Sequence, residues 1–77
     1  MRDRADDDWG GRVRLRRKEL GLTQTELAEL AGVDVRTVHA VEVGKSTLRL
    51  DALMAVVEAV GLRLVLEPTR SARPASP

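Results

Sequence analysis

The feature that most constrains this chain is the spacing of small and apolar residues between positions 23 and 43. Counted from Gln24, the first, fifth, ninth, tenth, fifteenth and eighteenth positions are Gln24, Ala28, Gly32, Val33, Val38 and Val41. This spacing fits two short helices that cross at Ala28 and are joined at Gly32, where a turn favours a residue without a Cβ. The pattern predicts a helix-turn-helix, an arrangement that can place its second helix in the major groove of DNA.

Capping and stop residues predict where the first two helices lie. Asp8 can cap a first helix over about 10–20, which Gly21 ends. Thr23 and Glu26 form a capping box at the start of the second helix. The spacing of the apolar residues in this second helix predicts that one buried stripe contains Leu27, Leu30 and Ala31.

Two further helices and a strand are expected after the turn. Asp34 can cap a third helix over about 35–43, which Gly44 ends. Its inward stripe is expected to be Val38, Val41 and Glu42, and that of a fourth helix, stopped by Gly61, to be Leu50, Leu53, Met54, Val57 and Val60. In residues 62–67, which follow, apolar and polar side chains alternate over the first half. This pattern suits a short strand that ends at Pro68.

That strand has no partner within the chain, so a second copy is the expected one. An antiparallel pair of these segments in a homodimer would satisfy the open edge. Its dimer-forming residues are expected to be Leu62, Leu64, Val65 and Leu66. The fold class is therefore all-α, with four helices and one C-terminal strand that pairs across a dimer.

Length and composition limit the classes of function. Seventy-seven residues make one domain, in which cysteine, phenylalanine and tyrosine are absent. The absence of cysteine excludes thiolate metal sites, and a single aromatic residue, Trp9, argues against the aromatic platforms on which RNA bases stack. We expect no enzyme, cofactor, metal or membrane span, and a cytoplasmic, nucleoid-associated protein. The expected organisation is a flexible lead-in (1–8), a DNA-binding domain (9–61), a dimerisation strand (62–67) and a disordered tail (68–77).

Charge is distributed unevenly. Residues 1–8 carry a net charge of −2, whereas residues 9–50 carry a net charge of +3 with eight basic and five acidic side chains. A basic body suits a polyanionic partner. Most of the cluster Arg12, Arg14, Arg16 and Lys18 is interpreted as a solvated face, and Trp9 as a core residue at the start of the first helix.

The motif residues resemble a known family. The segments 20–28, 31–33 and 41–45 (LGLTQTELA, AGV and VEVGK) resemble the phage-repressor and Cro type of helix-turn-helix, the Xre family. The segments 50–53 and 60–68 resemble the HipB-type antitoxins, which replace a fifth helix with a strand that pairs across a dimer. The resemblance covers about residues 9–68.

The resemblance implies roles for particular residues. Contacts to base edges are implied for Val35, Arg36, His39 and Ala40. Contacts to the DNA backbone are expected for Gln24, Thr37, Lys45 and Ser46. Gln24 is also expected to support the third helix. A buried ion pair is implied between Arg17 and Glu42. The glutamines with which the best-studied relatives read bases are missing here, so their operators do not transfer.

The chemistry of these side chains allows alternatives. Arg36 can contact guanine through two hydrogen bonds, or it can be a solvated charge. Val35 and Ala40 can touch a thymine methyl group, and His39 can donate to DNA or be an ordinary surface histidine. Glu42 points inward and needs a partner, so a structural pair is favoured over a DNA contact.

Three functional hypotheses follow. The first is an autoregulating antitoxin that binds a palindromic double-stranded operator as a homodimer and neutralises a kinase-like toxin of the HipA type. The second is a stand-alone repressor. The third is an interaction module that has lost DNA binding.

Overall fold

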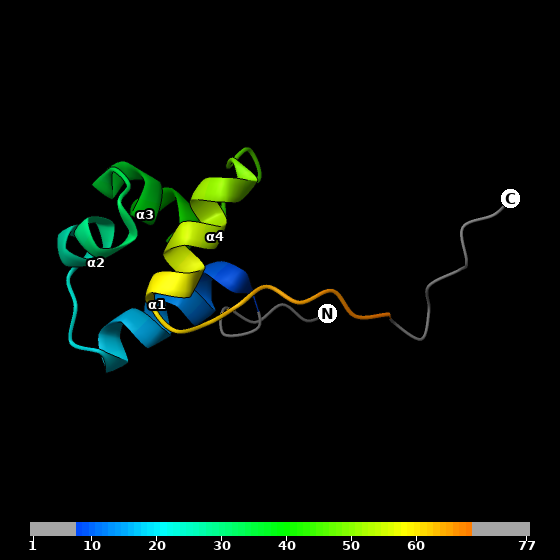
Figure 1. The fold of residues 1–77 in the computed structure, drawn as a ribbon, viewed down its shortest axis with the longest axis horizontal. Coiled ribbons are helices and arrows are strands. Elements are labelled where there is room, and N and C mark those ends of the chain that lie inside the picture. The colour runs from blue at the N-terminus through cyan, green and yellow to red at the C-terminus, as the bar shows by residue number, and fades with distance from the viewer. Residues whose placement is uncertain (1–7, 69–77) are drawn as a thin grey trace, which may run out of the picture.

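A computed structural model describes residues 8–68 of the chain. Four helices account for most of this part: α1 (Trp9–Glu19), α2 (Gln24–Ala31), α3 (Val35–Glu42) and α4 (Leu50–Ala59). α2 packs against α3 and α4, and α1 packs against α3, so that the helix-turn-helix pair lies at one end of the molecule (Figure 1). The prediction of four helices is confirmed, although the third ends at Glu42 and the fourth at Ala59.

Each of the first three helices is capped at its start by a side chain. Asp8 accepts a hydrogen bond from the Gly11 amide at 2.7 Å. In α2 the Thr23 hydroxyl accepts from the Glu26 amide at 3.0 Å, and the Glu26 carboxylate accepts from the Thr23 amide at 2.8 Å. These contacts satisfy amides that have no partner within a helix, as the capping residues predicted.

The turn between α2 and α3 depends on Gly32. Its φ is 73°, in the left-handed region, and its amide donates to the carbonyls of Ala28 and Glu29. A residue with a Cβ is strained in this conformation. The glycine therefore ends α2 and sets the direction in which α3 leaves, as the spacing predicted.

The core is aliphatic and draws on all four helices. Its fully buried members are Val13, Leu27, Ala28, Val38, Val41, Val56, Val57 and Val60. Trp9 packs against this cluster while only partly buried. The burial of Ala28 agrees with its predicted place where α2 and α3 meet.

Three residues expected in apolar stripes lie elsewhere. Leu30 and Leu50 are each 64% exposed, and Met54 is 39% exposed, so their predicted inward positions are wrong. Val56 is fully buried instead. The core-facing side of α4 contains Leu53, Val56, Val57 and Val60. It is therefore rotated by part of a turn relative to the predicted stripe.

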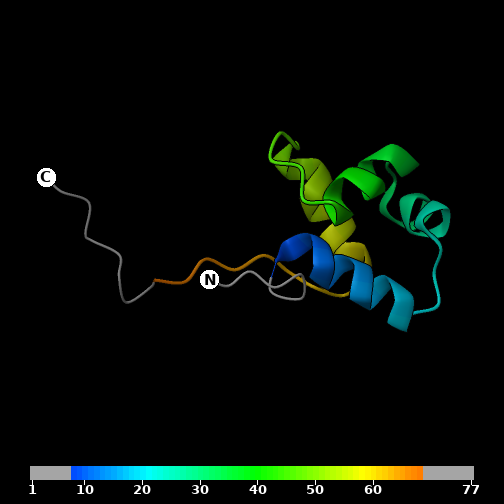
Figure 2. The same cartoon turned by 180° about the vertical axis from the view of Figure 1, so that it is seen from behind.

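The residues after α4 run as an extended segment. From the end of α4 this segment passes the start of α1 and then leaves the helices on the side away from α2 (Figures 1 and 2). Leu62 packs against the core, whereas Leu64, Val65 and Leu66 are exposed. Within residues 8–68 no strand is formed, and a strand over 62–67 stays a prediction because pairing needs a neighbouring strand.

The remaining expectations about the termini cannot be compared with the structure. The flexible lead-in (1–8) and the disordered tail (68–77) fall, apart from Asp8 and Pro68, on residues 1–7 and 69–77, which lie outside the described residues. In the part that is described, none of the helices is long and apolar enough to cross a membrane.

Candidate nucleic-acid interface

The outer face of α3 carries the residues predicted to meet base edges. Val35 is 39% exposed, the Arg36 side chain is 89% exposed, and His39 is exposed. Ala40 lies partly buried beside them. Val38 and Val41, on the opposite face, have no exposed surface and fix the helix to the core. α3 therefore presents one face to solvent and buries the other.

The residues predicted to contact the DNA backbone lie around this face. Gln24 begins α2 and Thr37 belongs to the first turn of α3, and both are partly buried. Lys45 and Ser46 are exposed in the connection between α3 and α4. Thr37 thus lies at the start of α3, whereas Lys45 and Ser46 follow its end and Gln24 contacts its last residue, Glu42.

Arg17 and Glu42 are joined by two hydrogen bonds. Nε of Arg17 donates to Oε2 of Glu42 at 2.7 Å, and Nη2 donates to Oε1 at 3.1 Å. Only 11% of the Arg17 side chain and 4% of the Glu42 side chain are exposed. The pair ties α1 to the last residue of α3, so it fixes where the outer face of α3 points.

Two further contacts extend the pair to α2. Nε2 of Gln24 donates to Oε1 of Glu42 at 3.0 Å. Nη1 of Arg17 donates to the Leu22 carbonyl at 2.9 Å, just before the capping box. One carboxylate thus holds the start of α2, the last turn of α1 and the end of α3 together. The resemblance implied that Gln24 supports the third helix, but it did not identify Glu42 as the partner.

The pKa values of the pair reflect this arrangement. Burial by itself would raise the pKa of Glu42, but hydrogen bonds from Arg17 and Gln24 and the nearby positive charges outweigh it and hold the pKa below its ordinary value. The hydrogen bond to Glu42 raises the pKa of Arg17. Both groups are therefore charged at neutral pH.

Arg16 also has a structural contact that was not predicted. Its Nε donates to the Val60 carbonyl at 3.1 Å, and its Nη1 donates to Glu19 at 3.2 Å. The first contact satisfies a carbonyl at the end of α4, where basic side chains are favourable. Arg16 therefore has a structural contact in addition to the solvent exposure predicted for this cluster, since 38% of its side chain remains exposed.

Arg36 lies beside the capping residue of its own helix. The Asp34 carboxylate accepts from the Arg36 amide at 2.7 Å, from Nε at 3.2 Å and from Nη2 at 3.4 Å. Because both side chains are well exposed, water screens their attraction. The sequence predicted Asp34 only as a cap.

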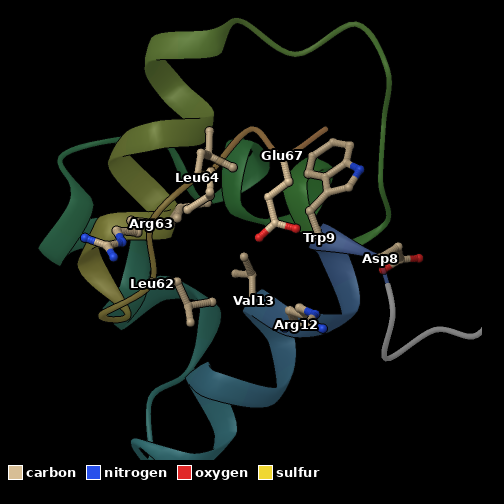
Figure 3. Close-up of a pocket in the computed structure, with 10 residues that line it drawn as sticks. Asp8, Trp9, Arg12, Val13, Leu62, Arg63, Leu64 and Glu67 are labelled. Atoms are coloured by element: carbon tan, nitrogen blue, oxygen red, sulfur yellow. The ribbon is translucent and has the colours of Figure 1, made fainter. Parts of the chain in front are cut away.

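An apolar groove of about 610 Å³ lies on a different part of the surface (Figure 3). Trp9 and Val13 of α1, Val57 of α4 and the extended segment with Leu62 and Leu64 line it. No residue of α2 or α3 contributes to its walls. Among residues 8–68, no group of three or more histidine, aspartate or glutamate side chains is placed to hold a metal ion.

Comparison with known proteins gives three results. Residues 13–66 match the family described as helix-turn-helix. An uncharacterised HTH-type transcriptional regulator, y4mF, of Sinorhizobium fredii is 39% identical over 62 residues, which cover 79% of this chain and 82% of that protein. An uncharacterised HTH-type transcriptional regulator of Methanothermobacter thermautotrophicus is 45% identical over 49 residues, covering 64% of this chain and 71% of that protein.

A solved structure has the same fold. The chain described as MDT Protein superposes with a TM-score of 0.73 at 20% sequence identity, covering 91% of this chain and 99% of the other. At this identity the likeness concerns the arrangement of the chain alone.

Proposed function

The chain belongs to the helix-turn-helix family of DNA-binding transcriptional regulators, and we propose that it is a repressor that blocks transcription by occupying promoter DNA. The observation that carries this proposal is the outer face of α3. The outer face of this helix exposes Val35, Arg36 and His39, and its opposite face is buried in the core. A rigid helix with an exposed arginine suits the reading of bases in the major groove.

The proposed role of each residue in DNA binding follows from the chemistry of its side chain. Arg36 contacts guanine, Val35 and Ala40 lie against thymine methyl groups, and His39 donates to a base or a phosphate. Phosphates on either side are held by Gln24, Thr37, Lys45 and Ser46. Because phosphate contacts release counterions, affinity falls steeply as salt is raised.

Selection of bound sequences from random duplexes tests this function. We expect enrichment of one motif that contains a guanine at a fixed position. Failure of the protein to enrich any sequence, or to retard any duplex at low salt, would contradict DNA recognition. That result would favour an interaction module that has kept the fold.

We also propose that the regulator works as a homodimer on a palindromic operator. Support comes from residues 62–67, where Leu64 is 44%, Val65 59% and Leu66 99% exposed in the single chain. Such a run of exposed apolar side chains is unfavourable in water unless a partner covers it. Two-fold pairing of this segment would place two copies of α3 about one helical turn, or a multiple of it, apart on DNA.

Finally, we propose that the protein is an autoregulating antitoxin that binds a kinase-like toxin of the HipA type. The support is the resemblance of residues 50–53 and 60–68 to HipB-type antitoxins. Co-expression with the product of an adjacent kinase-like gene tests the proposal, which requires both co-purification and loss of the product's toxicity. An operon that lacks such a gene would leave a stand-alone repressor.

A further inference from the structure

The guanidinium of Arg36 is already engaged by a carboxylate in the absence of DNA. Asp34 receives two side-chain hydrogen bonds from it, through Nε and Nη2. These two nitrogens form one edge of the planar guanidinium. The other edge carries Nη1 together with the second hydrogen of Nη2. Within residues 8–68, Nη1 of Arg36 has no hydrogen-bond partner.

Arg17 shows in the same molecule what this division of edges allows. Its Nε and Nη2 bind the Glu42 carboxylate, while Nη1 donates to the Leu22 carbonyl at 2.9 Å. One guanidinium thus donates to a carboxylate from one edge and to a carbonyl oxygen from Nη1. Arg36 likewise binds a carboxylate through Nε and Nη2. Its Nη1 is available for an acceptor such as O6 of guanine.

The Asp34 carboxylate is held in place by more than Arg36. Oδ1 accepts from the Arg36 amide at 2.7 Å as the cap of α3. Because capping already orders the Asp34 carboxylate, forming the ion pair costs conformational entropy only in the Arg36 side chain. The hydrogen bond from the Arg36 side chain also lowers the pKa of Asp34, so the carboxylate is charged at neutral pH.

We propose that Asp34 is a specificity-determining residue that positions Arg36 for guanine. The inference rests on the proposed function of α3. Asp34 holds the Nε edge, so that the free edge of the guanidinium points toward the two acceptors of guanine, O6 and N7. Its negative charge also opposes the use of Arg36 as a simple phosphate contact, because a phosphate would lie beside a carboxylate. Both effects increase the ratio of specific to non-specific binding.

The test compares Asp34→Asn, Arg36→Ala and the double variant with the wild-type chain. Asparagine keeps a good helix cap but removes the charge and one acceptor. Bound sequences are selected from random duplexes with the wild-type chain and with Arg36→Ala, which identifies the guanine that depends on Arg36. Fluorescence anisotropy then measures all four proteins on the selected duplex, on the duplex with that guanine replaced, and on an unrelated duplex.

We expect Asp34→Asn to reduce discrimination at that guanine by about threefold or more, as for coupled neighbouring side chains. Affinity for the unrelated duplex should stay equal or rise. In the Arg36→Ala background, Asp34→Asn should leave discrimination unchanged, which a role in capping alone does not predict. Helix content is followed by circular dichroism, and Asp34→Ser, which also caps, replaces the asparagine variant if that variant does not fold.

Two kinds of failure are distinguishable. Absence of any selected sequence with the wild-type chain contradicts the proposed function and this inference together. A selected guanine whose discrimination is the same in Asp34→Asn, or changes equally with and without Arg36, contradicts the inference alone. The inference is also wrong if Arg36→Ala changes no base preference, since Asp34 then has no base-reading arginine to position.

Discussion

At the scale of single residues, Glu42 connects three helices through hydrogen bonds. Its carboxylate accepts hydrogen bonds from Arg17 in α1 and Gln24 in α2, while its own backbone ends α3. The sequence indicated that Glu42 needs a partner, because a carboxylate on an apolar stripe is costly to bury alone, and the resemblance implied that this partner is Arg17. The resemblance implied a supporting role for Gln24, but its partner Glu42 could not be named, since the contact depends on how the start of α2 meets the end of α3.

Replacing Glu42 with alanine should destabilise the fold. The change leaves a nearly buried arginine charge without its carboxylate, which costs about 3 kcal/mol. A loss of that size should lower the melting temperature of a small domain by on the order of 10 °C or more. Glu29→Ala, at an exposed position of α2, is the control and should melt near the wild-type temperature. An unchanged melting temperature in Glu42→Ala with weakened DNA binding would instead assign Glu42 to the DNA interface.

The pH dependence of stability should show the same pair. Because the pKa of Glu42 is lower in the folded chain than its ordinary value of 4.5, ionised Glu42 adds stability above that value. This contribution is lost as pH falls through the ordinary value toward the lower folded pKa. The difference in unfolding free energy between the wild type and Glu42→Gln should be constant near neutral pH and shrink below about pH 4.5.

Urea unfolding at a series of pH values measures this difference. The exposed carboxylates Asp34 and Asp51 are present in both proteins, so their titration cancels. A difference that stays constant down to pH 3 would mean that the pKa of Glu42 is not lowered by folding.

At the scale of elements, capping residues predicted the helices better than apolar spacing predicted the core. Asp8, Thr23 and Asp34 begin helices because capping depends on neighbours within a few positions. Burial depends on what covers a face. In α4 most residues are apolar or small, so several stripes fit the sequence and the one with Leu50 and Met54 is wrong.

The Arg17–Glu42 pair predicted that α1 and α3 are neighbours, but the close approach of their backbones at Gly10 was not visible in the sequence. A Cβ at Gly10 would lie 2.5 Å from the Glu42 carbonyl oxygen and 2.7 Å from that of Val41. Both are backbone atoms, so they cannot move aside without shifting α3. A glycine in the first turn of a helix signals nothing by itself, because the steric demand comes from the facing helix.

Gly10→Ala should therefore destabilise the fold. Forcing the two helices apart costs about 1–3 kcal/mol, as overpacking does in other cores. Chemical denaturation of the two proteins measures the change. With space at this position, alanine in a helix would stabilise the protein by about 0.5–1 kcal/mol. A gain in stability would thus contradict the contact between α1 and α3.

At the scale of the whole molecule, the two ends of the chain's long axis have different surfaces. α2 and α3 lie at one end, and the extended segment with its exposed apolar side chains leaves the helices toward the other (Figures 1 and 2). A dimer built on residues 62–67 would leave both copies of α3 accessible to DNA. The sequence predicted this segment from its alternation and from a resemblance, and the pairing itself stays a prediction.

Leu66→Glu tests the dimer without disturbing the single chain. Leu66 is 99% exposed, so the glutamate should leave the fold of one protomer unchanged. Sedimentation equilibrium should give a dimer for the wild type and a weaker or absent dimer for Leu66→Glu. Leu30→Glu, at a leucine of α2 that is 64% exposed, is the matched control and should remain dimeric. A wild-type chain that stays monomeric at high concentration, or equal association of all three proteins, would contradict the proposal.

The most direct test of DNA recognition by the outer face of α3 is the affinity of Arg36→Ala for the selected duplex, measured beside Arg12→Ala. Both arginines are exposed, but Arg12 lies on α1 beside the apolar groove. Loss of a two-hydrogen-bond contact to guanine costs about 1–3 kcal/mol, so Arg36→Ala should bind about 5- to 150-fold more weakly. Arg12→Ala should bind nearly as tightly as the wild type. Equal losses for the two variants, or wild-type affinity for Arg36→Ala, would contradict the account.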